Sequence, residues 1–265
     1  MIRLWLTSLV LAAGLAASSK ITVTVIEQKS GKVVTGLKAE DFTVMDDRTN
    51  RPVESVDFGS TSAIDVMLLV DTSLVGGMVQ PVAVNLIGQL DQKEQMAVVA
   101  FHSSADLIQD FTSSKELLSR ALAGVKYGNT PRVLDALYAA IDGGFQSSSF
   151  RRVILLATSG YEGPSRVTER EVIRMARRNG VSIFPVYVSG VERSLFEKLA
   201  RQTGGASFSL RDMKKASDEA PGQRIFSVLR SFYTLTVRGN LSLGEKVTIE
   251  VKRPEKLLVS ALPLE

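Results

Sequence analysis

Apolar and polar residues follow two different rhythms along this chain, one at both ends and another in the middle. Near the amino end the run ITVTVI alternates apolar residues with threonines, and the run VTIEV repeats this period of two near the carboxyl end. The period predicts strands that bury one face. Because short strands are rarely stable on their own, we expect residues 19–60 and 233–265 to pair with each other in a small β-rich domain.

The middle of the chain, residues 61–232, alternates apolar runs with segments in which apolar residues recur at helical spacing. Four runs of near-continuous hydrophobicity predict strands that helices cover on both faces. These runs are Ile64–Val70, Met96–Phe101, Val153–Ala157 and Val181–Val188. The alternation of strand and helix predicts an α/β fold with an open, doubly wound and mostly parallel sheet.

Local signals refine the ends of these elements. Thr168-x-x-Glu171 and Ser113-x-x-Glu116 match the capping box that begins many helices. Pro185 lies inside the last apolar run and lacks the N–H group that a central strand needs. We therefore expect Pro185 near an edge of the sheet or at a bulge.

The first residues match a targeting segment. Arg3 precedes an apolar stretch from Leu4 to Leu15, and small residues follow at positions 16–18. This is the pattern of a secretory signal peptide, and the stretch is shorter than the about 20 residues that a membrane span needs. We expect residues 1–18 to be cleaved during export, which leaves a mature chain without a membrane span in the periplasm or outside the cell.

The composition narrows the chemistry. The 265 residues include no cysteine, which excludes disulfides, thiolate catalysis and cysteine-bound metals, and only one histidine, His102. Neither a Gly-x-Ser-x-Gly elbow nor a glycine-rich nucleotide-binding pattern is present, so we expect no enzyme activity. The net charge is +4 and aromatic residues make up 6%. With the expected export, these values argue against nucleic acid as a partner.

Polar groups gather where the predicted strands end. Asp71 and Ser73 follow the first buried strand, Thr130 lies in a Gly-Asn-Thr loop, and Ser159 follows the strand Val153–Ala157. Ligands of open doubly wound sheets bind beyond the carboxyl ends of the strands. We therefore expect these residues to meet in one candidate site.

Several segments together resemble a known family. They are VMLLVDTS (66–73), MAVVAF (96–101), GNTPRVLDAL (128–137), RVILLATSGYEG (152–163), VSIFPVYVSG (181–190) and, nearer the amino end, TGLKAEDFTVMDD (35–47). The chain resembles a von Willebrand factor A domain protein of the exported bacterial type, over nearly the whole mature chain. The resemblance implies a six-stranded Rossmann-like sheet in a module for protein binding or cell adhesion.

The resemblance also implies a metal-ion-dependent adhesion site, in which hydroxyls and carboxylates surround Mg²⁺ and an acidic group of the partner completes the octahedral shell. The implied ligand positions hold Asp71, Ser73, Val75, Thr130 and Ser159. Val75 offers no oxygen, and Ser159 stands where the family has an aspartate. Glu162 is close enough in sequence to be considered as a replacement carboxylate. Two readings stay open: a Mg²⁺ site of weakened affinity, or a hydrogen-bonded cluster with no cofactor.

A basic stripe is the other candidate surface. Arg170, Arg174 and Arg177 recur at helical spacing after the capping box, which predicts one arginine-rich helix face. Such a face binds acidic partners or is simply solvated, and the pattern leaves both open.

Together these patterns predict an exported, non-enzymatic module that binds another protein, or envelope or matrix material, through the loops at the carboxyl edge of the sheet. Its dependence on metal is weakened or lost. The alternative is a structural or assembly factor of the cell envelope that acts through its exposed strand edges. The oligomeric state does not follow from these patterns.

Overall fold

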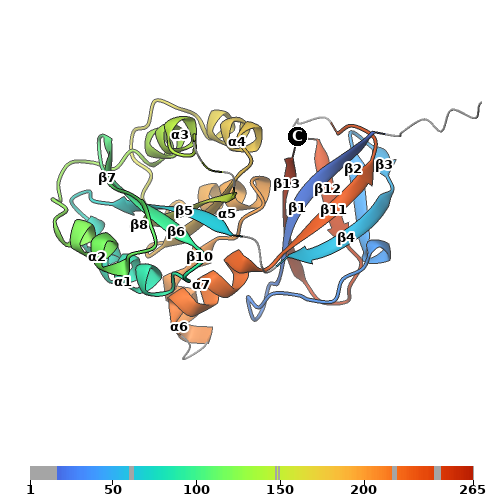
Figure 1. The fold of residues 1–265 in the computed structure, drawn as a ribbon, viewed down its shortest axis with the longest axis horizontal. Coiled ribbons are helices and arrows are strands. Elements are labelled where there is room, and N and C mark those ends of the chain that lie inside the picture. Colours follow the sequence, from blue (N-terminus) through green and yellow to red (C-terminus); the bar gives the residue numbers. More distant parts are fainter. Residues whose placement is uncertain are drawn as a thin grey trace, which may run out of the picture.

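The structure, a computed structural model, describes residues 17–59, 63–146, 148, 150–216, 220–241 and 246–264. The expected signal segment, residues 1–18, lies outside these residues except for its last two. The chain forms two lobes, an α/β lobe from its middle and a β lobe from its two ends (Figure 1). In the described part of the chain, no helix is long and apolar enough to cross a membrane.

A six-stranded sheet forms the centre of the α/β lobe, in the order β10-β9-β8-β5-β6-β7. Its strands are β5 (Ile64–Asp71), β6 (Gln95–Phe101), β7 (Ala105–Thr112), β8 (Arg151–Thr158), β9 (Val181–Tyr187) and β10 (Phe208–Ser209). All neighbours run parallel except β7, which pairs antiparallel with β6. This confirms the predicted doubly wound, mostly parallel sheet.

Helices cover both faces of this sheet. Figure 1 shows α3 (Val133–Gly143) and α4 (Glu169–Arg178) on one side, and α1 (Gln80–Gly88), α2 (Lys115–Ala123) and α7 (Pro221–Arg230) on the other. α5 (Arg193–Gln202) shares the core of α3 and α4, and α6 (Leu210–Ala216) precedes α7. In β5, Val66 and Leu68 enter one core while Met67 and Leu69 enter the other. Alternation along a strand thus explains why these strands have continuous apolar runs through their centres.

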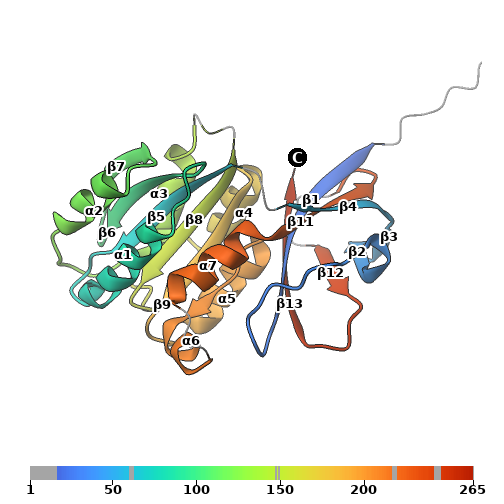
Figure 2. The same ribbon diagram turned by 60° about the horizontal axis from the view of Figure 1, so that its bottom comes forward.

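The β lobe joins strands from both ends of the chain in two sheets, ordered β13-β1-β11-β4 and β12-β2-β3. The first holds β1 (Ser18–Glu27), β4 (Val53–Gly59), β11 (Phe232–Arg238) and β13 (Leu257–Leu264), and the second holds β2 (Phe42–Asp46), β3 (Thr49–Arg51) and β12 (Val247–Val251). β1 lies between two carboxyl-terminal strands, since Ile21 pairs with both Leu235 and Pro263. The expected small β-rich sheet from both termini is therefore present (Figure 2).

Helix caps follow the predicted signals with one exception. The Thr168–Glu171 capping box is present, with Thr168 N–H donating to Glu171 Oε2 at 2.8 Å. The cap of α2 is Ser114 rather than Ser113, because Ser114 Oγ accepts from Leu117 N at 3.3 Å. The expected capping box of Ser113 and Glu116 is therefore wrong, because Ser114 caps α2 and position 117 holds leucine.

The two lobes touch where β1 and β13 approach the end of α5. Thr24 Oγ1 donates a buried hydrogen bond to the carbonyl of Gly204 at 2.8 Å. Gly204 has φ +70°, and a Cβ there would lie 2.8 Å from Leu262 Cβ. Only glycine fits this contact without strain, so the junction requires it.

Candidate functional site

Backbone hydrogen bonds join four loops into one layer at the carboxyl edge of the sheet. The loop before α3 meets the loop after β5, where Gly128 N donates to Thr72 O at 2.9 Å. The loop after β9 meets the loop after β8, where Ser189 N donates to Ser159 O at 2.9 Å. Asp71 connects these two pairs of loops.

The Asp71 side chain is fully buried and both of its oxygens accept backbone hydrogen bonds. Oδ1 accepts from Ser73 N at 2.9 Å, and Oδ2 accepts from Ser159 N at 2.9 Å. The Thr158 hydroxyl adds a longer contact to Oδ2 at 3.4 Å. No ion pair reaches Asp71 from any residue that the structure describes. The carboxylate thus organises the loops through N–H donors.

Two buried hydroxyls flank this carboxylate without partners. Ser73 Oγ and Ser159 Oγ are both buried and have no hydrogen bond among the described residues. Thr130 is exposed and follows Asn129, whose carbonyl accepts from Leu74 N at 3.0 Å. The structure therefore brings Asp71, Ser73 and Ser159 together, and the loop of Thr130 is bonded to the same layer.

This donor set is poor in negative charge for a divalent cation. It offers a single negative charge, at Asp71, whose oxygens already accept N–H groups. No group of three or more histidine, aspartate or glutamate side chains that could hold a metal occurs among the described residues. A divalent ion beside one carboxylate keeps an uncompensated charge in a buried place, which is costly.

Glu162 does not replace the missing carboxylate. Its Oε1 accepts from Leu134 N at 3.3 Å, and its carbonyl accepts from Val133 N at 3.2 Å. The side chain therefore caps the amino end of α3, where a negative charge is favourable. The suggestion that Glu162 reaches into the metal position is wrong.

Large apolar side chains project from the same four loops, including the short 3-10 turn Gly76–Val79 after β5. We call this set the top-loop surface. It consists of Leu74, Val75, Met78, Tyr127, Tyr161 and Val191. These six make up half of the large apolar side chains that are exposed in the described part of the chain, and Leu74 is 79% exposed. Exposed apolar residues are ordinary when scattered, but a concentration on one face marks an interaction site.

Tyr127 is a member of the top-loop surface whose pKa depends on Asp71. Burial raises the pKa of the Tyr127 hydroxyl, and the negative charge of Asp71 raises it further. Sequence patterns did not identify Tyr127, although its place directly before the Gly128-Asn129-Thr130 loop is a usable signal. The other members were missed because nothing in the sequence shows that a loop residue is exposed.

The expected arginine stripe is only partly exposed. Arg170 and Arg174 lie on the exposed face of α4. Arg177 is buried, and its Nε donates to the carbonyl of Gln202 at 2.9 Å. Arg177 therefore ties α4 to the end of α5, and its expected place in an exposed stripe is wrong.

His102 shows no catalytic arrangement. Its ring contacts its neighbour, with Nδ1 2.9 Å from Ser103 Oγ, and Nδ1 also accepts from Ser103 N at 2.6 Å. Asp71 is bonded elsewhere, as described above. Ser103, His102 and Asp71 therefore do not form a hydrogen-bonded chain of nucleophile, base and carboxylate.

The fold and the loop layer agree with a comparison to known families. The von Willebrand factor type A domain family matches residues 65–220, more than half of the chain. The chain therefore belongs to the von Willebrand factor type A domain family. Domains of this family are generally non-enzymatic and commonly serve in protein interaction.

Solved structures share this fold at low sequence identity. Proximal thread matrix protein 1 from the mussel byssus, with a zinc-occupied adhesion motif, is 15% identical at a TM-score of 0.53, over 73% of this chain and 50% of its own. A von Willebrand factor type A protein from Catenulispora acidiphila is 11% identical at a TM-score of 0.53, over 95% and 74%. An aerotolerance-related membrane protein from Bacteroides fragilis is 9% identical at a TM-score of 0.52, over 64% and 99%.

These similarities concern the fold alone. The chain spans about half the length of the mussel protein that it matches. No curated protein sequence matches the chain.

Proposed function

We propose that this protein is a non-enzymatic binding module that recognises another protein through its top-loop surface. The observation that carries the proposal is the concentration of exposed apolar side chains on loops that Asp71 holds together. Burying apolar surface contributes about 25 cal/mol per Å². Because hydrogen bonds already order these loops, little conformational entropy is lost on binding.

The proposed recognition does not depend on metal. Each Asp71 oxygen accepts a backbone N–H group, from Ser73 or Ser159, and Val75 presents an apolar side chain where the family resemblance implies a ligand. Apolar contact thus takes the place of a bridging ion. Asp71 is a positioning residue for the loops in this proposal, and Thr130 contributes to the rim of the surface.

The proposed setting is outside the cytoplasm. The pattern of residues 1–18 supports export, and β1 begins at Ser18, so the expected segment ends at the first residue of the first strand. The partner would then be another exported protein, or an envelope or matrix component. This is the setting of the exported bacterial proteins that the chain resembles.

The test is a binding comparison between variants of the mature chain. Envelope and secreted fractions of the source cells are passed over immobilised wild type, a Leu74→Ser/Val191→Ser variant, and a Leu107→Ser/Leu117→Ser control. The control removes two exposed leucines that lie away from the top loops, on β7 and α2. We expect the wild type and the control to retain the same partner and the top-loop variant to lose it, with EDTA making no difference.

Two results would contradict the proposal. If the top-loop variant keeps the partner, the binding surface lies elsewhere, and assembly through strand edges becomes the better explanation. If EDTA releases the partner, binding uses a metal, and the hydroxyls of Ser73 and Ser159 become the residues to replace next.

A further inference from the structure

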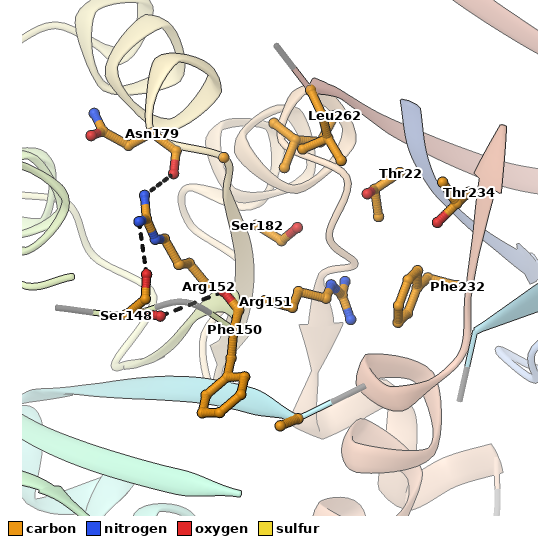
Figure 3. Close-up of a pocket in the computed structure, with 13 residues that line it drawn as sticks. Thr22, Ser148, Phe150, Arg151, Arg152, Asn179, Ser182, Phe232, Thr234 and Leu262 are labelled. Carbon is orange, nitrogen blue, oxygen red and sulfur yellow. Dashed lines mark hydrogen bonds between the residues drawn. The ribbon is translucent and has the colours of Figure 1, made fainter. Parts of the chain in front are cut away.

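A cavity of about 640 Å³ lies between the two lobes. β8 and β9 line it near their amino ends, and β1, β11 and β13 line its other side (Figure 3). Asp71 ends β5 whereas Arg151 begins the parallel neighbour β8. The cavity therefore lies at the opposite end of the sheet from the top-loop surface, and its function is independent of the proposed function of that surface.

Arg151 supplies an unpaired cation to the wall of this cavity. Its Nη1 donates to the carbonyl of Leu229, and its guanidinium carbon lies 4.2 Å from the centre of the Phe232 ring. Nε and Nη2 are buried and have no hydrogen-bond partner among the described residues. Burial lowers the pKa of the guanidinium to about 9, which leaves it charged at neutral pH.

The cavity lining contains no counter-charge among the described residues, and the buried Asp65 on the neighbouring strand pairs in register with Arg152 rather than with Arg151. None of the described residues that line the cavity is an aspartate or a glutamate. A second arginine, Arg152, donates to the carbonyls of Asn179 at 2.9 Å and Ser148 at 3.0 Å, as Figure 3 shows. A buried cation without a carboxylate is costly, so an anion that enters the cavity would relieve that cost.

A further donor lies on the same wall. Ser182 Oγ is buried and, within the described part of the chain, makes no hydrogen bond. Figure 3 shows Ser182 on the strand beside Arg151, facing the same space as Thr22 and Thr234. Buried polar groups are normally satisfied, so the free groups of Arg151 and Ser182 in one cavity point to an absent acceptor.

The two nitrogens of Arg151 that have no partner among the described residues indicate which kind of acceptor fits. Nε and Nη2 lie on the same edge of the guanidinium and form the fork that matches the two oxygens of a carboxylate. Arg152 already donates to two carbonyls, so Arg151 alone offers a free fork, which compensates a single negative charge. Apolar side chains complete the walls at Phe150, Phe232, Leu262 and Leu264.

We propose that this cavity binds a monocarboxylate with an apolar body. The carboxylate pairs with the Nε and Nη2 edge of Arg151 and accepts from Ser182 Oγ, while the apolar body lies against the rings and leucines of the wall. Binding requires the Arg151 side chain to rotate, because the Nε and Nη2 edge is buried in this structure.

The experiment titrates the mature chain with benzoate, benzamide and inorganic phosphate by isothermal calorimetry. Benzoate has the required charge and apolar body, benzamide has the same shape without the charge, and phosphate has charge without the apolar body. We expect saturable binding of one benzoate, at least about tenfold tighter than either of the others.

Variants locate the site. Arg151→Lys keeps the charge and loses the fork, so we expect benzoate affinity to fall by at least about tenfold. Ser182→Ala removes one donor and is expected to weaken binding severalfold. Arg120→Lys, on the exposed end of α2, is the matched control and should bind as the wild type does.

Several outcomes would overturn the proposal. Equal affinity for benzoate and benzamide, or no binding of either, would show that the cavity does not recognise a carboxylate. Tightest binding of phosphate assigns the cavity to a different anion. Unchanged benzoate affinity in Arg151→Lys places binding elsewhere. If Arg151→Lys does not fold, Ser182→Ala and Phe150→Ala, at a side chain 49% exposed, decide the question in the same way.

Discussion

Asp71 shows how a single side chain can join two loops through backbone hydrogen bonds. Its two oxygens accept N–H groups from two different loops, at 2.9 Å each. The neighbouring hydroxyls of Ser73 and Ser159 have no hydrogen-bond partner in the described part of the chain. We therefore expect the Asp71 carboxylate to contribute to the free energy of unfolding and the two hydroxyls to contribute little.

Replacing Asp71 tests this difference. Asp71→Ala leaves two buried N–H groups without acceptors, so we expect the free energy of unfolding to fall by about 2–4 kcal/mol. Ser73→Ala removes a hydroxyl that has no partner, so we expect a change within about 0.5 kcal/mol or a small gain. Urea unfolding of both variants measures the two effects. A larger loss in Ser73→Ala than in Asp71→Ala would contradict the assignment.

Adding metal ions is a second test of the Asp71 cluster. We expect the thermal midpoint of the mature chain to be the same in EDTA and in millimolar Mg²⁺ or Mn²⁺. A ligand at 100 times its dissociation constant stabilises the folded state by about 2.7 kcal/mol, which moves the midpoint by a few degrees. A rise of that size that disappears in Asp71→Ala would show that the cluster holds a cation after all.

Tyr127 offers a titration that reports on Asp71. Burial and the Asp71 charge raise the pKa of Tyr127. Because the folded pKa lies above the unfolded value of about 10, the neutral form is favoured by folding. This contribution to stability is present below the unfolded pKa and is lost as the pH rises above it.

Asp71→Asn removes one of the two causes, so Tyr127 should ionise at a lower pH in that variant. The difference in tyrosinate absorbance between each protein and its Tyr127→Phe counterpart isolates this residue from the other tyrosines. An unchanged titration in Asp71→Asn would mean that the two side chains do not interact.

The elements of the α/β lobe differ in how well their sequences predict them. Buried strands such as β5 and β8 have long central apolar runs because both faces are covered; β5 was predicted to within one residue, and β8 begins two residues before its predicted start. β7 was missed because its side chains are mostly exposed or half-buried and it has no apolar run. β10 was missed because it has only two residues. Sequence therefore predicts the covered strands of this sheet better than its edges.

Pro185 was expected near an edge of the sheet or at a bulge because it has no N–H group to donate. Ile183, two residues earlier, donates its N–H to Thr203 Oγ1 at 3.1 Å rather than to a strand. Residues two apart point the same way along a strand, so the Pro185 nitrogen faces the side where only the short β10 pairs. The missing N–H costs no ladder bond there, in agreement with the expected position near an edge.

The candidate site was predicted in part. The positions of Asp71, Ser73 and Ser159 follow from strand ends, which parallel topology brings together. The predicted positions of the Glu162 and Arg177 side chains were wrong because sequence does not say which way such a side chain points. Contacts with α3 fix the direction of Glu162, and contacts with the end of α5 fix that of Arg177. The apolar character of the top-loop surface depends on loop conformation, which no periodicity encodes.

The end of α7 depends on a partly buried ion pair with the turn before β6. Arg230 Nε and Nη2 donate to the two oxygens of Glu94 at 2.7 Å each, and Glu94 is buried. Glu94→Ala leaves a half-buried cation without its partner, so we expect a loss of about 2–3 kcal/mol in unfolding free energy. Glu197→Ala breaks the exposed pair with Arg193 and should cost less than about 1 kcal/mol. Equal losses in urea unfolding would contradict the role of burial.

At the scale of the whole molecule, the two lobes differ in how they use the chain. The α/β lobe is continuous in sequence, and its two cores draw almost wholly on residues between Ile64 and Leu229. The β lobe is assembled from both ends, and its core joins β1 side chains such as Val23 to Tyr233 and Leu235 of β11. We expect the first lobe to fold without the second, and neither half of the second to fold alone.

A chain that ends after Ser231 tests this dependence. It removes β11 and β13, the two strands that pair with β1, so Ile21, Val23 and Val25 lose the partners that bury them. We expect residues 17–59 to exchange their amide hydrogens like an unfolded segment, while β5 and β8 stay protected, as measured by hydrogen exchange and mass spectrometry. A chain that begins at residue 63 is the reciprocal control and should leave residues 232–264 unprotected. Protection of residues 17–59 in the first chain, or loss of protection in β5 and β8, would mean that the lobes do not fold as separate units.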